Sequence, residues 1–389
     1  MKNEYPAVSD QRSAISRSPL VADGWLPMTA SQVNPTSSLQ HPASSTTLAL
    51  TAGDPCGIGP EVILKALAAR AIPPHVRLIV IGDHTVFAST AKRLRRPLPA
   101  WRVLPAREAL SATLSEGFTF LDCGHPQVFR PGSSSMEAGK ASLAYLSQAV
   151  ALWRARRLHA MVTAPVTKWA VALTHPAFVG QTEYFASAMR VRDVAMMFVS
   201  EPLRVVLLTR HLPLQHVAHA ITRPLIRTTL RLTSRILRER FHIRRPRLAL
   251  CGLNPHAGEA SQCGHEEARI MTPLLRALRK EGLICEGPFA ADGFFAQMLH
   301  PAQGSQPTGR GSREYDAVVC AYHDQGLIPF KMVARDRGCQ LTVGLPIIRT
   351  SPDHGTALDI AGRGAAHPGS MIYALQLAAR LARGASAFR

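Results

Sequence analysis

Three histidines stand shortly after apolar, strand-like segments of the sequence. His211 ends the run VVLLTRH, His256 follows LALCGLNP, and His323 follows AVVCAY. Because the strands of one parallel sheet bring their carboxyl ends to one edge, three such histidines indicate a shared site. Three neutral imidazoles would leave an open position on a divalent metal, as in catalytic sites. The alternative for each histidine is a hydrogen-bonded structural role, which is the commoner fate of a single histidine after a strand.

Two aspartates and a lysine near these segments are the candidate proton acceptors. Asp324 follows His323 directly, and Asp292 lies upstream of that strand, in a segment expected to be a loop. Carboxylates in such places accept a proton or orient a metal-bound histidine. Lys168 follows the apolar run 160–165, where a lysine serves as a proton carrier, as an anion contact or as an ordinary surface residue.

Strand-like and helix-like segments alternate along the chain and must position these residues. From Thr47 the pattern reads strand, glycine-rich turn and a helix that opens at Pro60 and Glu61. The spacing of Gly53, Gly57 and Gly59 is not that of a dinucleotide-binding fingerprint, so the turn is either a ligand loop or a tight structural turn. The alternation predicts an α/β protein with a mainly parallel sheet.

Composition places the chain among globular proteins of ordinary size. Its 389 residues are enough for two domains, and 46% are hydrophobic while 18% are charged. No apolar run approaches the ~20 residues of a membrane span, so we expect no membrane partner and a cytoplasmic protein. Seven scattered cysteines without a C-x-x-C pair predict neither a disulfide framework nor a zinc knuckle.

The net charge of +19 raises the alternative of nucleic-acid binding. Arg227, Arg231 and Arg235 recur every four residues between apolar positions, which is typical of the solvated face of an amphipathic helix. Aromatic residues are few and no nucleic-acid motif is present. We therefore expect a basic surface that attracts anionic substrates, with no nucleic-acid partner.

Several motifs, in matching order and spacing from about Thr47 to the carboxyl terminus, resemble those of a known enzyme family. They are GDPCGIGPE (53–61), APVTK (164–168), GQTE (180–183), HLPL (211–214), GLNPHAGE (252–259), YHDQGLIPFK (322–331) and GLPIIRTSPDHGTALDIAG (344–362). The chain in this respect resembles the 4-hydroxythreonine-4-phosphate dehydrogenase family of vitamin B6 biosynthesis.

The resemblance implies a two-domain α/β fold similar to isocitrate and isopropylmalate dehydrogenases. One domain would comprise residues 47–165 and 330–389 on the nucleotide side, and the other, residues 166–329, would carry metal, substrate and dimer contacts. Residues 1–46, rich in Ser, Pro, Gln and Ala, are expected to form a disordered extension. The resemblance further implies a homodimer whose active sites lie in the interdomain cleft at the subunit interface.

The family's functional residues fall on matching positions of this chain. The metal ligands, for one Zn, Mg, Co or Mn ion, would be His211, His256 and His323. NAD or NADP would be held by the loop from His354 to Gly362. The substrate contacts are Gln181, Thr182, Lys331, Gln340 and Arg349, and the cofactor contacts are His354, Gly355, Thr356, Ala357 and Asp359.

Two substrate contacts depart from the family. The family has histidine where this chain has Gln181 and asparagine where it has Gln340, and Gln181 cannot carry a positive charge towards a phosphate. The expected reaction is metal-dependent oxidation of 4-phosphohydroxy-L-threonine, with Lys331 and Arg349 holding an anionic group and arginine offering a bidentate grip. The alternative is a paralogous dehydrogenase for another anionic hydroxy acid, such as a phosphorylated four-carbon sugar acid or a dihydrodiol carboxylate.

Overall fold

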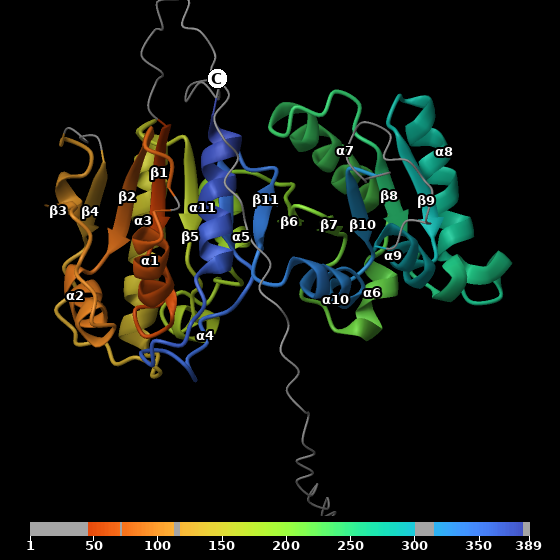
Figure 1. Ribbon diagram of the computed structural model, residues 1–389. Helices are drawn as coiled ribbons and strands as arrows, with labels where there is room; N and C mark the ends of the chain where they lie inside the picture. Colours follow the sequence, from red (N-terminus) through yellow and green to blue (C-terminus); the bar gives the residue numbers. More distant parts are fainter. Residues whose placement is uncertain (1–45, 71, 113–116, 300–314, 384–389) are drawn as a thin grey trace, which may run out of the picture. The chain divides into compact units, whose positions relative to one another are not determined.

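A sheet of twelve strands organises the part of the chain that the computed structural model describes, residues 46–70, 72–112, 117–299 and 315–383 (Figure 1). The strand order is β3-β4-β2-β1-β5-β12-β11-β6-β7-β10-β8-β9. The strands are β1 (Thr46–Thr51), β2 (Val76–Gly82), β3 (Arg102–Pro105), β4 (Phe118–Asp122), β5 (Ala160–Thr163), β6 (Ala195–Ser200), β7 (Arg204–Leu207), β8 (Leu248–Cys251), β9 (Cys285–Phe289), β10 (Ala317–Cys320), β11 (Gly338–Val343) and β12 (Ile348–Pro352).

Most neighbouring strands of this sheet run parallel. Of the eleven pairs in the described residues, eight are parallel and three are antiparallel. The antiparallel pairs join β12 to β11, β11 to β6 and β6 to β7, so they occupy the middle of the sheet with a parallel group on either side. The predicted α/β class with a mainly parallel sheet is confirmed.

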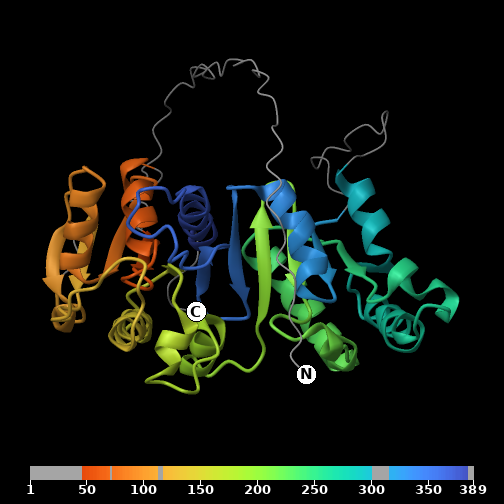
Figure 2. The same ribbon diagram turned by 90° about the horizontal axis from the view of Figure 1, so that it is seen from below.

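Helices cover both faces of the sheet (Figure 2). α1 and α11 pack together on one face, and α3 packs with α4 on the other. Within the described residues, none of the helices has the length and apolar character needed to cross a membrane. The helices are α1 (Gly59–Ala68), α2 (His84–Arg93), α3 (Met136–Arg154), α4 (Lys168–Ala172), α5 (Gln181–Ala188), α6 (Leu214–Ala220), α7 (Arg223–Glu239), α8 (Thr272–Lys280), α9 (Ala291–Leu299), α10 (His323–Ala334) and α11 (Gly369–Ala382), with short 3-10 segments at Ala106–Glu108 and Pro255–Ser261 and a π-helical turn at Glu267–Met271.

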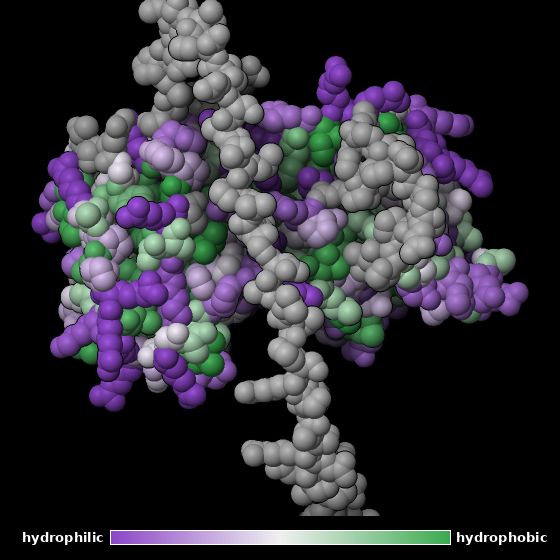
Figure 3. Space-filling model, viewed as in Figure 1, coloured by the Kyte–Doolittle hydropathy of each residue, from purple (hydrophilic) through white to green (hydrophobic). Residues whose placement is uncertain are grey.

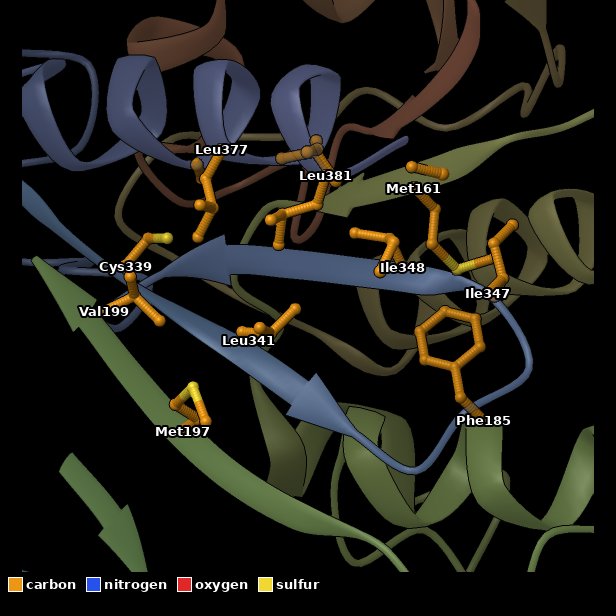
Figure 4. Packing of buried hydrophobic residues seen from close by; sticks show 14 of the residues in the cluster. Met161, Phe185, Met197, Val199, Cys339, Leu341, Ile347, Ile348, Leu377 and Leu381 are labelled. Atoms are coloured by element: carbon orange, nitrogen blue, oxygen red, sulfur yellow. The ribbon is translucent and has the colours of Figure 1, made fainter. Parts of the chain in front are cut away.

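Apolar and polar residues alternate along β11 and β12, so one face of these strands packs into the hydrophobic core under α11 and the other face is polar. Cys339, Leu341 and Ile348 are buried beneath α11, where Leu377 and Leu381 pack over the strands (Figure 4). Truncating such a buried leucine to alanine typically costs about 2–5 kcal/mol. Because successive side chains of a strand point to opposite faces, the intervening residues of both strands lie on the face away from α11.

Several predicted elements are found in place, and one prediction was wrong. The strand, glycine turn and helix predicted from Thr47 are β1, the segment 52–58 and α1. Asp292, expected in a loop, lies in the first turn of α9. The predicted amino-terminal extension, residues 1–46, lies outside the described residues except for Thr46, with which β1 begins. The division into two domains stays a prediction.

Candidate active site

A cavity of about 320 Å³ lies against the antiparallel centre of the sheet. Its walls come from β6, β11, β12, α4, α5 and α10, and from the segments that follow β5, β7 and β12. The cavity brings together ten of the residues predicted from the sequence, which are Lys168, Gln181, Thr182, His211, His323, Lys331, Gln340, Arg349, His354 and Gly355. The other six, His256, Asp292, Asp324, Thr356, Ala357 and Asp359, do not line it.

Strand register places the polar residues of β11 and β12 next to one another. Thr342 pairs with Arg349, and Gln340 pairs with Ser351 on one side and with Phe198 of β6 on the other. These residues occupy alternate positions, so they share the face opposite the core. The hydroxyls of Thr342 and Ser351 were not among the predicted site residues, although the period of two from Gln340 and Arg349 would have pointed to them.

Arg349 is buried on this face and, among the described residues, forms no ion pair with a carboxylate. The residue is 3% exposed, and burial lowers the pKa of the guanidinium to about 10, opposed by the negative charge of Glu183. Nε and Nη2 donate to Thr163 Oγ1 at 3.0 and 2.6 Å, and Nη1 donates to Thr342 Oγ1 at 2.9 Å and Thr182 Oγ1 at 3.4 Å. The group remains charged at neutral pH and is surrounded by neutral oxygens, so it favours a nearby anion.

Gln340 and Gln181, the two substrate contacts that differ from the family, are the remaining hydrogen-bond acceptors around Arg349. Gln340 Oε1 accepts from Arg349 Nη1 at 2.9 Å, and Gln181 Oε1 accepts from Nη2 at 3.1 Å. Gln181 Nε2 is itself fixed by donation to the Ala164 carbonyl at 3.0 Å. With these two contacts, all five N–H donors of the guanidinium have a protein acceptor. A bidentate grip on a substrate would therefore require exchange of one of these partners.

Two lysines and two acidic residues, Glu183 and Asp353, also line the cavity. Lys168 opens α4, and Lys331 on α10 donates to the Asp353 carbonyl at 3.3 Å. Glu183, which also lines the cavity, pairs with Arg210 at 3.1 Å. Glu183 was not predicted as a site residue, although it is part of the GQTE motif.

His211 and His323 face each other at the rim of the cavity. They follow the neighbouring parallel strands β7 and β10, and their ring centroids are 6.0 Å apart. Partial desolvation and the charge of Lys168 lower the pKa of His211, which favours the neutral imidazole that a metal requires. Asp324 Oδ1 lies 2.6 Å from His323 Nδ1 and orients that ring, leaving Nε2 available to a ligand.

His256 follows the next parallel strand, β8, but does not join the other two histidines. It is exposed on the segment Pro255–Ser261, and the described residues contain no group of three side chains arranged to hold a metal. Gln325 ties the loops after β10 and β8 together, because it accepts from Ala321 N and donates to the Gly252 carbonyl, both at 2.7 Å. The sequence thus predicted the shared sheet edge, and within one chain that edge offers two imidazoles to the cavity.

The segment 354–359 begins at the cavity and then packs on the glycine turn that follows β1. Ile58 N donates to the Thr356 carbonyl at 3.0 Å, and a Cβ at Gly57 would lie 3.0 Å from the same oxygen. Ala357 has φ of 41°, and Asp359 is exposed beyond it. His354 Nε2 is buried, with no hydrogen-bond partner among the residues described. Such an orphaned polar atom fits a site that a bound cofactor completes.

The fold and the cavity define a mixed α/β protein whose pocket contains a buried arginine held by neutral hydrogen-bond acceptors. The family described as "Pyridoxal phosphate biosynthetic protein PdxA" matches residues 75–378. The chain belongs to this family.

Relatives match over most of their own length. A 4-hydroxythreonine-4-phosphate dehydrogenase of Bradyrhizobium diazoefficiens is 41% identical over 349 residues, which is 86% of this chain and 96% of the relative. The crystal structure of the Klebsiella pneumoniae 4-hydroxythreonine-4-phosphate dehydrogenase has a TM-score of 0.74 and 35% identity, covering 88% of this chain and 99% of that one. A terephthalate 1,2-cis-dihydrodiol dehydrogenase from Burkholderia xenovorans has a TM-score of 0.57 and 27% identity, covering 86% and 98%.

Proposed function

We propose that the chain oxidises 4-phosphohydroxy-L-threonine with NAD or NADP. The resulting 3-oxo acid would lose carbon dioxide and yield 3-amino-2-oxopropyl phosphate, a step of vitamin B6 biosynthesis. Membership of the family supports the reaction class. The observation that carries the proposal is the buried Arg349, which faces a pocket of suitable size and, among the described residues, donates hydrogen bonds to neutral oxygens.

The substrate's anionic groups would be held by Arg349 and by Lys331. Lys331 presents a flexible ammonium group to the same space as the buried guanidinium. Ammonium groups bind phosphate and carboxylate as point charges, without the planar fork of arginine. Thr182 and Gln181 would add neutral hydrogen bonds to the substrate.

Proton transfer from the substrate hydroxyl requires an acceptor inside the cavity. Of the three candidates, Lys168 lines the cavity, whereas Asp324 and Asp292 do not. We therefore assign the proton to Lys168, which would accept it as the neutral amine, while the hydrogen on the same carbon leaves as hydride to the nicotinamide. Asp324 would act on His323 as its orienting partner.

A divalent metal would be held by His211 and His323 of one chain and by His256 of a second copy. Such an ion lowers the pKa of a bound hydroxyl and stabilises negative charge on the oxygen. The neutral state of His211 fits this role, and the exposed position of His256 makes it available to a neighbouring molecule. The ligand set is then complete in a homodimer and incomplete in a monomer.

Apolar residues around the cavity support the homodimer. Trp169 on α4 is 55% exposed, Leu214 on α6 is 70%, and Ile328 and Met332 on α10 are 60% and 74%. Figure 3 shows hydrophobic side chains over α10 and α6 on the visible face. Large exposed apolar residues gathered around a polar site are typical of a surface that another protein covers.

The nicotinamide cofactor would bind along the segment from His354 to Asp359. His354 and Gly355 line the cavity, so this segment leads from the substrate towards the glycine turn after β1. His354 Nε2 would find its hydrogen-bond partner on the cofactor. Thr356, Ala357 and Asp359 would contact the part of the nucleotide farther from the reacting carbon.

A substrate panel tests the reaction. The Zn²⁺-loaded protein is assayed with NAD and with NADP on 4-phosphohydroxy-L-threonine, on a phosphorylated four-carbon sugar acid and on a dihydrodiol carboxylate. We expect the highest kcat/KM with 4-phosphohydroxy-L-threonine. The likeness to the Burkholderia xenovorans dehydrogenase and the presence of Gln181 and Gln340 favour the dihydrodiol acid as the second candidate. A preference for that compound would replace the proposed substrate while keeping the reaction class.

Mixing two inactive variants tests the shared metal site. His256→Ala and His323→Ala should each lose metal and activity without unfolding. In a mixed dimer, one cavity would receive intact His211 and His323 from one chain and intact His256 from the other. Random mixing should then restore about a quarter of the wild-type activity, since half of the dimers carry one complete site of two. No recovery in dimers shown to be mixed would place all three ligands within one chain or exclude one of them.

A further inference from the structure

A buried carboxylate lies beneath the loop that carries His256. Glu267 begins the π-helical turn Glu267–Met271 and is 4% exposed. Its Oε1 accepts from the backbone N–H groups of Leu253 and Asn254, both at 2.8 Å, and its Oε2 accepts from Asn254 Nδ2 at 2.9 Å. None of these donors is a cation. The carboxylate therefore fixes Leu253 and Asn254, the two residues that directly precede Pro255 and His256.

The loop itself has a backbone that needs such an anchor. His256, Ala257, Glu259 and Ala260 have φ values of 53°, 53°, 42° and 53°, and Gly258 between them has 85°. For residues other than glycine, this left-handed region costs about 1–2 kcal/mol each. Consecutive residues remain there only when surrounding contacts determine the conformation.

Glu267 also shapes the loop by contact. A Cβ at Gly258 would lie 2.8 Å from Glu267 Oε2, and one at Gly252 would lie 3.1 Å from Oε1. The loop thus wraps closely around the carboxylate on two sides. A π-helical turn at the start of the next element places Glu267 there, and such turns are frequent at functional sites.

We infer that Glu267 is the positioning residue for His256. It does not touch the imidazole, and it acts by fixing the backbone from which that side chain projects towards a second copy of the chain. This inference rests on the proposed function, in which His256 is a metal ligand. Neither the motif GLNPHAGE nor the strand pattern identified Glu267, because it follows them in the sequence and shows its role only through the folded loop.

Zn²⁺ affinity separates positioning from mere stabilisation. In Glu267→Gln one oxygen still accepts from the backbone, but the new amide N–H₂ faces the donor Asn254 Nδ2. We expect Zn²⁺ binding to the full chain, measured by calorimetry, to weaken by about tenfold or more, the usual effect of losing a group that orients a ligand. The matched control is Glu266→Gln, whose carboxylate accepts from Asn254 Nδ2 at 2.8 Å but does not reach the backbone of residues 253 and 254. It should leave the affinity unchanged.

Thermal unfolding of the same variants completes the test. A lower unfolding temperature with unchanged Zn²⁺ affinity would make Glu267 a purely structural residue and overturn the inference. If Glu267→Gln does not fold, Glu267→Asp keeps the charge, withdraws it by one methylene, and is judged by the same comparison. His256→Ala distinguishes failure of the proposed metal role of His256 from failure of the positioning role of Glu267. Wild-type affinity in that variant would remove the metal role of His256, whereas loss there with wild-type affinity in the Glu267 variants would defeat only the positioning role.

Discussion

The guanidinium of Arg349 donates to the Gln340 side-chain oxygen at 2.9 Å, and both residues are buried on the polar face of the sheet. The same oxygen accepts from Ser351 Oγ at 2.8 Å, while Gln340 Nε2 donates to Thr342 Oγ1 at 3.0 Å. Gln340 is thereby held so that its oxygen cannot leave Arg349 without breaking other bonds. Arg349 is not paired with an opposite charge at this contact, because the partner is an amide and not a carboxylate.

Gln340→Glu should raise stability and weaken substrate binding at the same time. The substitution keeps the shape of the side chain and places a carboxylate on the buried guanidinium, where a charged hydrogen bond contributes about 1.5–3 kcal/mol. The added negative charge beside Arg349 should raise KM for the anionic substrate by about tenfold or more. Chemical unfolding and steady-state kinetics measure the two effects.

The opposite signs of these effects are the informative part of the experiment. Gln148→Glu is the matched control, since Gln148 is partly buried, donates to the Ala106 carbonyl at 3.0 Å and lies outside the cavity lining. It should leave KM unchanged. An unchanged KM in Gln340→Glu would mean that Arg349 does not attract the substrate.

Arg349→Lys and Arg349→Met distinguish the contribution of the positive charge to substrate binding from that of the planar, bidentate guanidinium. All five N–H donors already have protein acceptors, so we expect substrate binding to depend on the charge. The lysine variant should keep KM within about tenfold of wild type, and the methionine variant should raise it by about a hundredfold, the equivalent of one charge–charge contact. An equal rise in KM in both variants, each shown to be folded, would indicate that the substrate displaces Gln181 and accepts two hydrogen bonds from the guanidinium.

Ten of the residues singled out from the sequence line one cavity, but the sequence did not indicate how their side chains contact one another. Strand-end histidines led correctly to neighbouring parallel strands, because adjacency at a sheet edge follows from the βα alternation. That Gln181 and Gln340 meet on Arg349 depends on the register between β11 and β12 and on where α5 begins, which no local pattern encodes. Glu267 was missed for the same reason, since its partners become neighbours only in the folded loop. The separation of His256 from the other histidines likewise depends on a left-handed backbone that its residue types do not favour.

Stability should depend on the protonation of His159, outside the active site. Thr47 N donates to His159 Nδ1 at 3.0 Å, which ties the start of β1 to the residue before β5. Burial and, to a lesser degree, the charge of Arg77 lower the pKa of His159, so below its usual pKa of about 6.5 the unfolded chain binds a proton that the folded chain resists. This contribution to the free energy of unfolding is therefore present at pH 7.5 and declines as the pH falls below 6.5.

His159→Asn isolates this dependence, because the amide oxygen can accept from Thr47 N but does not titrate. Wild type should lose stability relative to the variant between pH 7.5 and pH 5.5, by no more than about 1.4 kcal/mol per pH unit for one proton. Urea unfolding at several pH values provides the comparison. Parallel curves for the two proteins would show that His159 does not contribute.

Met332→Glu should convert the proposed dimer into an inactive monomer while leaving the fold intact. Met332 is 74% exposed on α10, directly after the cavity residue Lys331 and one turn from the exposed Ile328, and a buried unpaired carboxylate in an apolar interface is costly. Light scattering should report the monomer, and activity should fall although every cavity residue is retained, because His256 of a second copy is then missing. Val128→Glu is the control, since Val128 is 90% exposed and lies outside the cavity lining. A fully active monomer in Met332→Glu would show that one chain completes the site alone.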